Sequence, residues 1–123
     1  MKGETRLAPP NSMILVMDPT SGVVPEAMHG IVASTSSCAA VGTLAEMDGE
    51  TTIRLRTGTN EAVAQPGTLV FDEEIAVSSG RMAVCTSRLE TVLEIAVLGD
   101  RPRVRIWVND PTEPSLIDIV VDG

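Results

Sequence analysis

The sequence predicts an all-β protein: an antiparallel β-sandwich or flattened barrel of about nine short strands with little helix. Apolar residues recur at every second position through much of the second half of the chain, as in Val104, Ile106 and Val108. This period of two is typical of half-buried strands, because successive side chains of a strand point to opposite faces. Turn-forming dipeptides separate the runs, and the chain has no long segment with a helical pattern.

Nine segments carry this strand pattern or a related apolar run. They are residues 13–17, 31–34, 38–47, 51–57, 68–77, 81–86, 90–98, 102–108 and 115–121. Aromatic residues are scarce, so the core is expected to be aliphatic. The period predicts that the following side chains are buried: Ile53, Leu55, Phe71, Ile75, Val77, Leu93, Ile95, Val104, Ile106 and Ile119.

Turn residues explain how several of these segments end. Val16-Met-Asp-Pro-Thr20 and Val108-Asn-Asp-Pro-Thr112 share an Asp-Pro-Thr turn, in which Asp bonds the backbone and Pro presets φ. The repeat is too short to be a duplicated unit, so we interpret it as a shared turn. Asp48-Gly49 predicts a two-residue hairpin between residues 38–47 and 51–57, since both residues tolerate positive φ.

Length and composition predict one domain over residues 13–123, preceded by a flexible N-terminal arm over residues 1–12. The first ten residues lack the apolar stretch of a signal peptide, and we therefore expect a cytoplasmic protein. No apolar run approaches the roughly 20 residues of a membrane span. Cys38 and Cys85 are expected to be small buried hydrophobes, although a disulfide between them is left open.

The net charge is −8 and the isoelectric point is near 4.5. A surface of this sign repels phosphate groups, so we expect neither a nucleic-acid nor a membrane partner. Solubility alone would explain the charge. The more specific interpretation is an acidic surface that is matched to a basic protein partner.

The sequence carries no strong catalytic or metal-binding pattern, and we expect no cofactor and no metal. His29 is the only histidine, so any Ser-His-Asp or Cys-His arrangement would have to use it. One histidine and two distant cysteines lack the spacing of zinc ligands. Carboxylates gather near turns, and loops at one end of a sandwich could bring some of them together for a hard cation, but the calcium-loop pattern is absent. These carboxylates are Asp48, Glu50, Asp72, Glu73, Glu74, Asp100, Asp110, Glu113, Asp118 and Asp122. Solvated loop charge is the favoured interpretation of these residues.

Two further features are candidates for partner binding. Glu73 occupies a position that the period assigns to the core, which predicts a β-bulge or an edge strand there, or alternatively a paired-carboxylate site in a cleft. Arg103, Arg105 and Trp107 share the face opposite Val104, and Trp and Arg are enriched in binding hot spots. The alternative is a cross-strand ladder in which the arginines neutralise acidic neighbours such as Glu94.

Residues 68–121 resemble the second half of competence protein J-like β-sandwich domains. The resemblance lies in Leu69-Val-Phe-Asp72, Met82-Ala-Val84, Leu93-Glu-Ile95, Arg103-Val-Arg-Ile-Trp107 and Ile117-Asp-Ile-Val120. That family includes inhibitors of DNA-entry nucleases and many bacterial proteins. The resemblance is one of strand pattern, so it transfers no functional residue. It implies a small acidic protein that masks a basic protein partner.

Together these observations favour a small acidic, non-catalytic interaction module of the inhibitor or immunity type. Its candidate partner-binding residues are Arg103, Arg105, Trp107, Glu73 and Asp110. One alternative is a small-ligand-binding protein or enzyme with a carboxylate-lined pocket. Another is a self-associating structural domain such as a homodimer.

Overall fold

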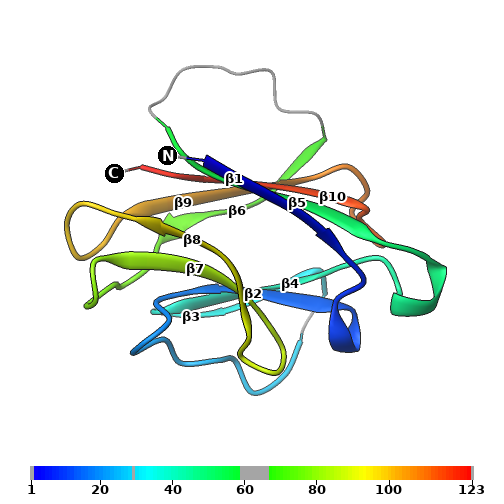
Figure 1. Cartoon of the computed structure of the whole chain (residues 1–123), viewed down its shortest axis with the longest axis horizontal. Coiled ribbons are helices and arrows are strands. Elements are labelled where there is room, and N and C mark those ends of the chain that lie inside the picture. The colour runs from blue at the N-terminus through cyan, green and yellow to red at the C-terminus, as the bar shows by residue number, and fades with distance from the viewer. Residues whose placement is uncertain (1, 29, 59–66, 123) are drawn as a thin grey trace.

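The computed structural model describes residues 2–28, 30–58 and 67–122, and these form two five-stranded sheets packed face to face (Figure 1). Sheet A has the order β1 (Lys2–Leu7), β5 (Thr51–Thr57), β10 (Leu116–Val121), β9 (Arg103–Val108) and β6 (Thr68–Glu74). Sheet B has the order β3 (Val32–Thr35), β4 (Cys38–Gly42), β2 (Met13–Met17), β7 (Arg81–Thr86) and β8 (Thr91–Ala96). Within these described ranges the helical elements are two 3-10 turns, η1 (Pro10–Ser12) and η2 (Glu46–Asp48). This architecture confirms the predicted all-β sandwich with little helix.

Most neighbouring strands are antiparallel, as predicted. The exception is the pair β5 and β10, which run parallel with Ile53 opposite Ile117 and Leu55 opposite Ile119. β10 is the central strand of sheet A, because β9 pairs with its other edge. The two halves of the chain are therefore joined within one sheet.

The inner faces of the sheets meet in one aliphatic core. Val104, Ile106 and Val108 of β9 are fully buried there, as their period predicted. Nine of the ten predicted core residues are buried, and Leu93 is half-buried against the core. Leu93 lies on the edge strand β8, and its Cδ2 is only 3.0 Å from the position that a Cβ on Gly3 would occupy. Gly3 thus lets β1 approach β8 closely where the two sheets meet.

Residues 2–7 form strand β1, whereas the sequence predicted a flexible arm over residues 1–12. The strand pairs antiparallel with β5, with Gly3 opposite Leu55 and Thr5 opposite Ile53. These two inward positions carry no large apolar side chain, so the alternating pattern is hidden in the sequence. The strand exists because β5 supplies its hydrogen-bond partners.

The hairpin predicted at Asp48-Gly49 is wrong. β4 ends at Gly42 in sheet B, and β5 begins at Thr51 in sheet A. The residues between them therefore cross from one sheet to the other and carry η2, instead of turning back on the same sheet. Gly49 does have a positive φ of 133°, so the turn residue is used, but in a longer connection.

The outer face of sheet B is apolar, in contrast to that of sheet A. A second buried cluster forms on it, with Leu15 and Met17 from β2, Cys38 and Ala40 from β4, and Ala83 and Cys85 from β7. Figure 1 shows that the connection between β2 and β3 passes over this face. Sheet B is therefore buried on both sides, which explains why β2, β4 and β7 have nearly continuous apolar sequences.

Cys38 and Cys85 are buried in this cluster and both are free thiols. β2 lies between their strands, so their backbones are separated by two strand spacings, about 10 Å. A disulfide requires a Cα separation below about 7 Å, so this pair is not positioned to form one. Burial raises the pKa of the Cys38 thiol to about 12 and also raises the pKa of Cys85.

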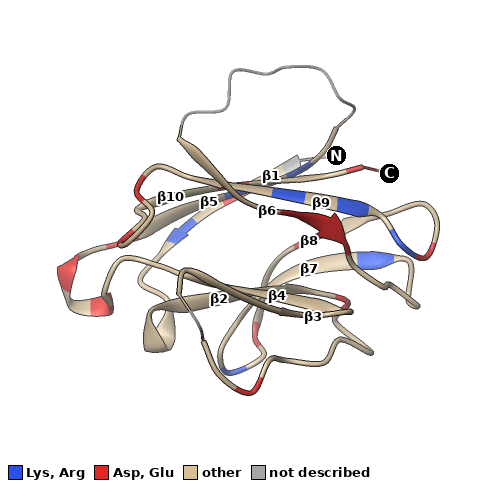
Figure 2. Cartoon of the chain, turned by 180° about the vertical axis from the view of Figure 1, so that it is seen from behind, with Lys and Arg blue, Asp and Glu red and all other residues tan. Residues whose placement is uncertain are grey.

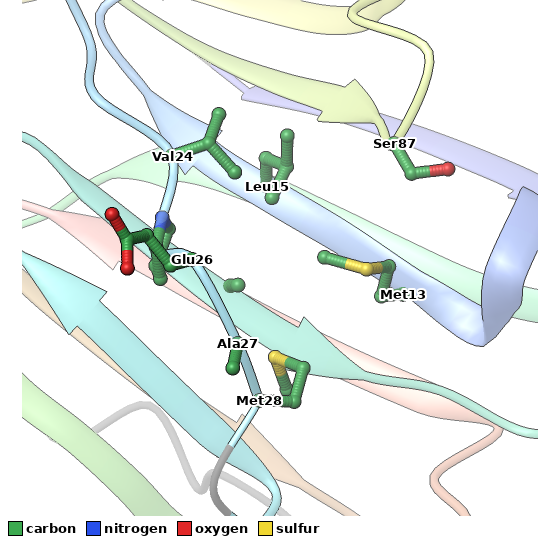
Figure 3. Close-up of a pocket in the computed structure, with 9 residues that line it drawn as sticks. Met13, Leu15, Val24, Glu26, Ala27, Met28 and Ser87 are labelled. Carbon is green, nitrogen blue, oxygen red and sulfur yellow. The ribbon is translucent and has the colours of Figure 1, made fainter.

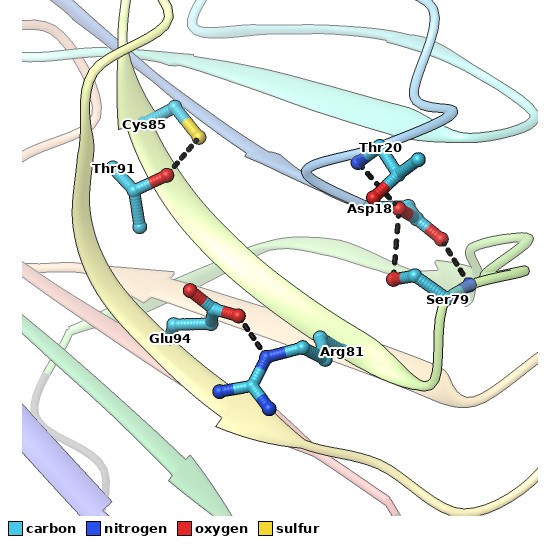
Figure 4. A network of polar contacts seen from close by, with 7 residues as sticks. All are labelled: Asp18, Thr20, Ser79, Arg81, Cys85, Thr91 and Glu94. Carbon is cyan, nitrogen blue, oxygen red and sulfur yellow. Dashed lines mark hydrogen bonds and ion pairs between the residues drawn. The ribbon is translucent and has the colours of Figure 1, made fainter.

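Asp18 fastens the start of the connection that covers sheet B (Figure 4). Its side chain is fully buried and accepts hydrogen bonds from the backbone of Thr20 (2.7 Å), Ser78 (2.7 Å) and Ser79 (2.8 Å). Burial acts to raise the pKa of Asp18, but the hydrogen bonds from Ser79, Thr20 and Ser21 outweigh it and lower that pKa well below its usual value. The ionised carboxylate therefore ties β2 to the turn before β7.

Candidate functional site

Two loops rich in acidic residues meet at one end of the sandwich, beyond the starts of β5 and β10. The amide of Leu44 donates to the carbonyl of Pro114 at 2.8 Å, and the amide of Thr52 donates to the carbonyl of Ser115 at 2.8 Å. We call this region the acidic end and define it by five exposed carboxylates: Glu46, Asp48, Glu50, Asp110 and Glu113. Neither loop, 43–50 or 109–115, contains a Lys or Arg. Figure 2 shows acidic segments gathered at this end of the molecule.

The loop from β9 to β10 is held by its own hydrogen bonds. Asp110 accepts from the backbone amide of Thr112 at 2.9 Å and from the Thr112 hydroxyl at 2.8 Å. These bonds, with one from the amide of Glu113, lower the pKa of Asp110. The Asn109 side chain accepts from the amides of Ser115 and Leu116. The loop is therefore ordered by local contacts, and Asp110 is held in its ionised form.

An exposed apolar side chain lies among these carboxylates. Met47 is the central residue of η2, and 97% of its surface is exposed. Met is one of the residue types enriched at protein interfaces. The acidic end thus combines unneutralised charge with one apolar contact point.

Charge on the outer face of sheet A is neutralised internally. Arg103, Arg105 and Trp107 share this face, as predicted from their alternation with buried residues. Arg103 Nε lies 2.6 Å from Asp72 Oδ1, and Arg105 Nη1 lies 3.1 Å from Asp122 Oδ1. Trp107 is half-buried between Leu69 of β6 and Asp118 of β10, its partners in register. These contacts form the cross-strand ladder that was one of the two interpretations.

Glu94 does not take part in this ladder, contrary to the prediction. It lies on β8 in sheet B and forms an ion pair with Arg81 of β7 (Figure 4). The prediction failed because the pairing of strands across the two sheets cannot be derived from alternation alone. The acids that neutralise the arginines come instead from the ends of β6 and β10.

Asp118 lies in the centre of sheet A and is 4% exposed. Its Oδ2 is 3.5 Å from Nη2 of Arg56, and it stands opposite Arg54 across the parallel pair. Burial raises the pKa of the Asp118 carboxyl, and the charges of Arg56 and Arg54 offset part of that effect. This carboxylate is a buried member of the ladder.

Glu73 is exposed at the free edge of sheet A. Glu73 belongs to β6, an edge strand, and stands opposite Val104 of β9. The register of β6 is irregular between Leu69 and Phe71. The edge location that was predicted to accommodate its charge is therefore present, whereas the register irregularity lies before Phe71 and does not include Glu73. Asp110 follows the other end of β9, so the structure does not bring these two candidate residues together.

The predicted site residues are thus divided among three places. The arginines and Trp107 lie in the ladder, Glu73 lies at the edge and Asp110 lies in the acidic end. Of the acidic end, Glu46 and Met47 were missed, because their segment was predicted to end a strand. His29 lies outside the described residues. Within the described ranges, no group of three or more His, Cys, Asp and Glu side chains is arranged to hold a metal. The same ranges contain no helix that is both long and apolar enough to cross a bilayer.

The fold of the described residues defines a class: an all-β sandwich of ten strands in two sheets. No family model matches the sequence, and no curated protein does. Among solved structures, the chain is similar to ComJ from Bacillus subtilis, described as an inhibitor of the DNA-degrading activity of NucA. That match has a TM-score of 0.62 and 13% identity, and covers 98% of this chain and 95% of ComJ. A second structure, described as crocagin biosynthetic gene J, has a TM-score of 0.60 and 14% identity over 99% of this chain and 95% of that one. At these identities the likeness is one of fold.

Proposed function

We propose that this protein is a small acidic, non-catalytic interaction module that binds and masks a basic protein partner through its acidic end. The observation that carries the proposal is the five-carboxylate acidic end, which makes no ion pair with any described residue, while Arg103 and Arg105 of sheet A are neutralised. The similarity in fold to ComJ, itself an inhibitor of a nuclease, supports an inhibitory role. The two free, buried cysteines fit action in a reducing cytoplasm.

The geometry of the acidic end suits fast and specific association. Unpaired carboxylates on one end of a protein attract a basic partner and raise the rate of encounter. The hydrogen bonds within residues 109–115 order that loop before binding, which reduces the entropy that binding costs. Met47 supplies an apolar contact between the charges. Arg103 and Arg105 of sheet A, in contrast, would have to give up existing partners.

The test begins with capture of a partner on the immobilised protein from the cytoplasm of the source organism, followed by association kinetics with the purified partner. We expect a basic partner whose rate of association falls as salt is raised. The double variant Glu50→Lys/Glu113→Lys should slow association by about tenfold or more at low salt. Neither carboxylate accepts a hydrogen bond from any described residue, so this variant should fold normally.

The matched control is Glu73→Lys/Asp100→Lys, which changes the net charge by the same amount at the opposite end of β9. We expect its association rate to fall much less than that of the acidic-end variant. An equal or greater loss in the control would move the docking surface to the β6 edge and contradict the proposed location. An acidic partner, or association that is independent of salt, would overturn the proposed function.

A further inference from the structure

We propose that a pocket on the outer face of sheet B receives one lysine or arginine side chain of the protein partner. The inference rests on the proposed function, because it identifies a contact within the same complex. The pocket has a volume of about 270 Å³ and lies between sheet B and the connection that covers it (Figure 3). Small-ligand pockets start at about 300 Å³, so this one is suited to a single long side chain.

The pocket is apolar along most of its wall. Leu15 and Ala40 are buried on the sheet beneath it, and Val24 lies on the connection. Met13 and Met28 line it from β2 and from the end of the connection (Figure 3). Methionine side chains are flexible and polarisable, so they adapt to the shape of an inserted chain. This lining matches the aliphatic stem of a lysine or arginine.

Glu26 gives the pocket its charge. Among the described lining residues it is the one ionisable side chain, it is exposed, and no described residue forms an ion pair with it. The other polar side chain, Ser87, is occupied: its hydroxyl accepts from Asn11 at 2.8 Å and donates to the carbonyl of Pro10. Lysine and arginine bury an apolar stem and keep the charged head at the surface, which fits an apolar pocket with a carboxylate at its rim. An acidic side chain would be repelled by Glu26 and by the net charge of −8.

Hydrogen bonds also link the residues around the pocket to η2 at the acidic end. Ser87 bonds the side chain of Asn11 in η1. Two bonds then link the neighbouring Ser12 to the chain that leads to η2: its carbonyl accepts from the amide of Thr43 at 2.8 Å, and its hydroxyl accepts from the amide of Glu46 at 3.3 Å. One basic partner can therefore contact η2 and place a side chain in the pocket at the same time.

The direct test is a titration of protein labelled with ¹³C at the methionine methyl groups. The probes are acetylated, amidated Gly-Arg-Gly and Gly-Lys-Gly, compared with Gly-citrulline-Gly, a neutral isostere of the arginine peptide, and with Gly-Leu-Gly. We expect the two basic peptides to shift the Met13 and Met28 methyl signals, and the two neutral peptides to bind more weakly. Glu26→Gln should weaken the basic peptides by about two- to fivefold, as expected for a solvent-exposed ion pair.

Ala27→Phe should abolish binding, because Ala27 is an exposed lining residue and a larger side chain there fills the pocket from the connection. Glu73→Gln, with the same change in net charge as Glu26→Gln, is the matched control and should leave binding unchanged. The proposal is overturned if the leucine peptide binds as well as the basic ones, or if neither basic peptide moves the two signals.

The same variants separate this proposal from the proposed function. If Glu50→Lys/Glu113→Lys slows association with the partner while Ala27→Phe leaves its affinity unchanged, the pocket proposal fails and the proposed function stands. If the basic peptides occupy the pocket but no basic protein is captured, the proposed function fails and the pocket retains its specificity for a basic side chain.

Discussion

The outer face of sheet A carries a ladder of arginines and carboxylates, whereas the outer face of sheet B carries methionine, leucine, alanine and cysteine. Both sheets have five strands and both bury their inner faces in the same core. Figure 2 shows the basic stretch of β9 beside the acidic residues in the last part of β6, while β2 and β4 of sheet B carry no charge. The charged side chains on the outer face of sheet A pair with one another, whereas the apolar outer face of sheet B is covered by the connection between β2 and β3.

This difference determines how each strand appears in the sequence. A strand with one apolar and one charged face alternates, as β9 does. A strand that is covered on both sides has a continuous apolar run, as in the Met-Ile-Leu-Val-Met sequence of β2. The continuous run is therefore a signal that another segment must pass over the sheet, and here that segment is the connection between β2 and β3.

The largest effect on stability is expected when an apolar side chain is removed from the covered outer face of sheet B. Leu15 is on the outer face of sheet B and 1% exposed, so Leu15→Ala should lower the free energy of unfolding by about 2–5 kcal/mol. Ile106→Ala on the inner face of sheet A should cost a similar amount. Urea unfolding measures both. Leu69→Ala, on the outer face of sheet A and 44% exposed, is the control and should cost less than about 1 kcal/mol. A Leu15→Ala cost in the range of the control would show that the covered face is not part of the core.

A second test loosens the connection between β2 and β3 without changing the apolar side chains that it covers on sheet B. Asp18→Asn removes the charge that accepts hydrogen bonds from Thr20, Ser78 and Ser79, and should cost about 1.5–3 kcal/mol at neutral pH. Because the folded-state pKa lies below the unfolded value of about 3.9, this stability is fully present above that pH and is lost as pH falls toward the folded pKa. Urea unfolding from pH 7 to pH 3 should therefore show the difference between wild type and variant shrinking in acid.

The control for Asp18 is Asp110, which occupies the same Asp-Pro-Thr turn in an exposed loop. Asp110→Asn should change stability less than Asp18→Asn, because its carboxylate bonds only its own loop. Equal costs at the two positions would mean that the turn itself accounts for the effect, rather than the hydrogen bonds from Ser78 and Ser79 that tie β2 to the turn before β7.

The smallest expected effect concerns the charged face. Trp107 is half-buried in the ladder, so Trp107→Ala should cost about 1–2 kcal/mol of stability and leave the rate of association with the captured partner unchanged. Unfolding and binding are measured on the same preparation, with the wild type as reference. A loss of binding of about 2 kcal/mol or more would make Trp107 an interface anchor and the ladder a docking face.

The sequence predicted the strands that alternate and missed the features that depend on pairing between distant segments. Val104, Ile106 and Val108 were assigned correctly, because burial of one face imposes the period on each strand separately. β1 was missed, since Gly3 and Thr5 provide no apolar signal and the strand depends on β5. The Asp48-Gly49 hairpin was predicted wrongly, because local turn chemistry does not reveal that the next strand belongs to the other sheet.

The candidate site was predictable to a similar extent. Asp110 and Glu113 were identified as loop carboxylates, and so were Asp48 and Glu50. That the two loops adjoin depends on the hydrogen bonds from Leu44 to Pro114 and from Thr52 to Ser115, which join segments 70 and 63 residues apart (114 − 44 and 115 − 52). No local pattern encodes such contacts. The neutralisation of Arg103 and Arg105 by Asp72 and Asp122 also depends on contacts between distant segments. It distinguishes the ladder, where charges are paired, from the acidic end, where no described residue pairs with the carboxylates.

The central position of β10 has a consequence for the order of folding. All five strands of sheet B lie between residues 13 and 96, so sheet B can form without β9 and β10. Sheet A at that stage has β1 beside β5 and an isolated β6, with the inner side chains of β5 and one of its edges uncovered. Until β9 and β10 have joined sheet A, the folding chain exposes an apolar strand edge, the kind of surface that invites aggregation or a chaperone.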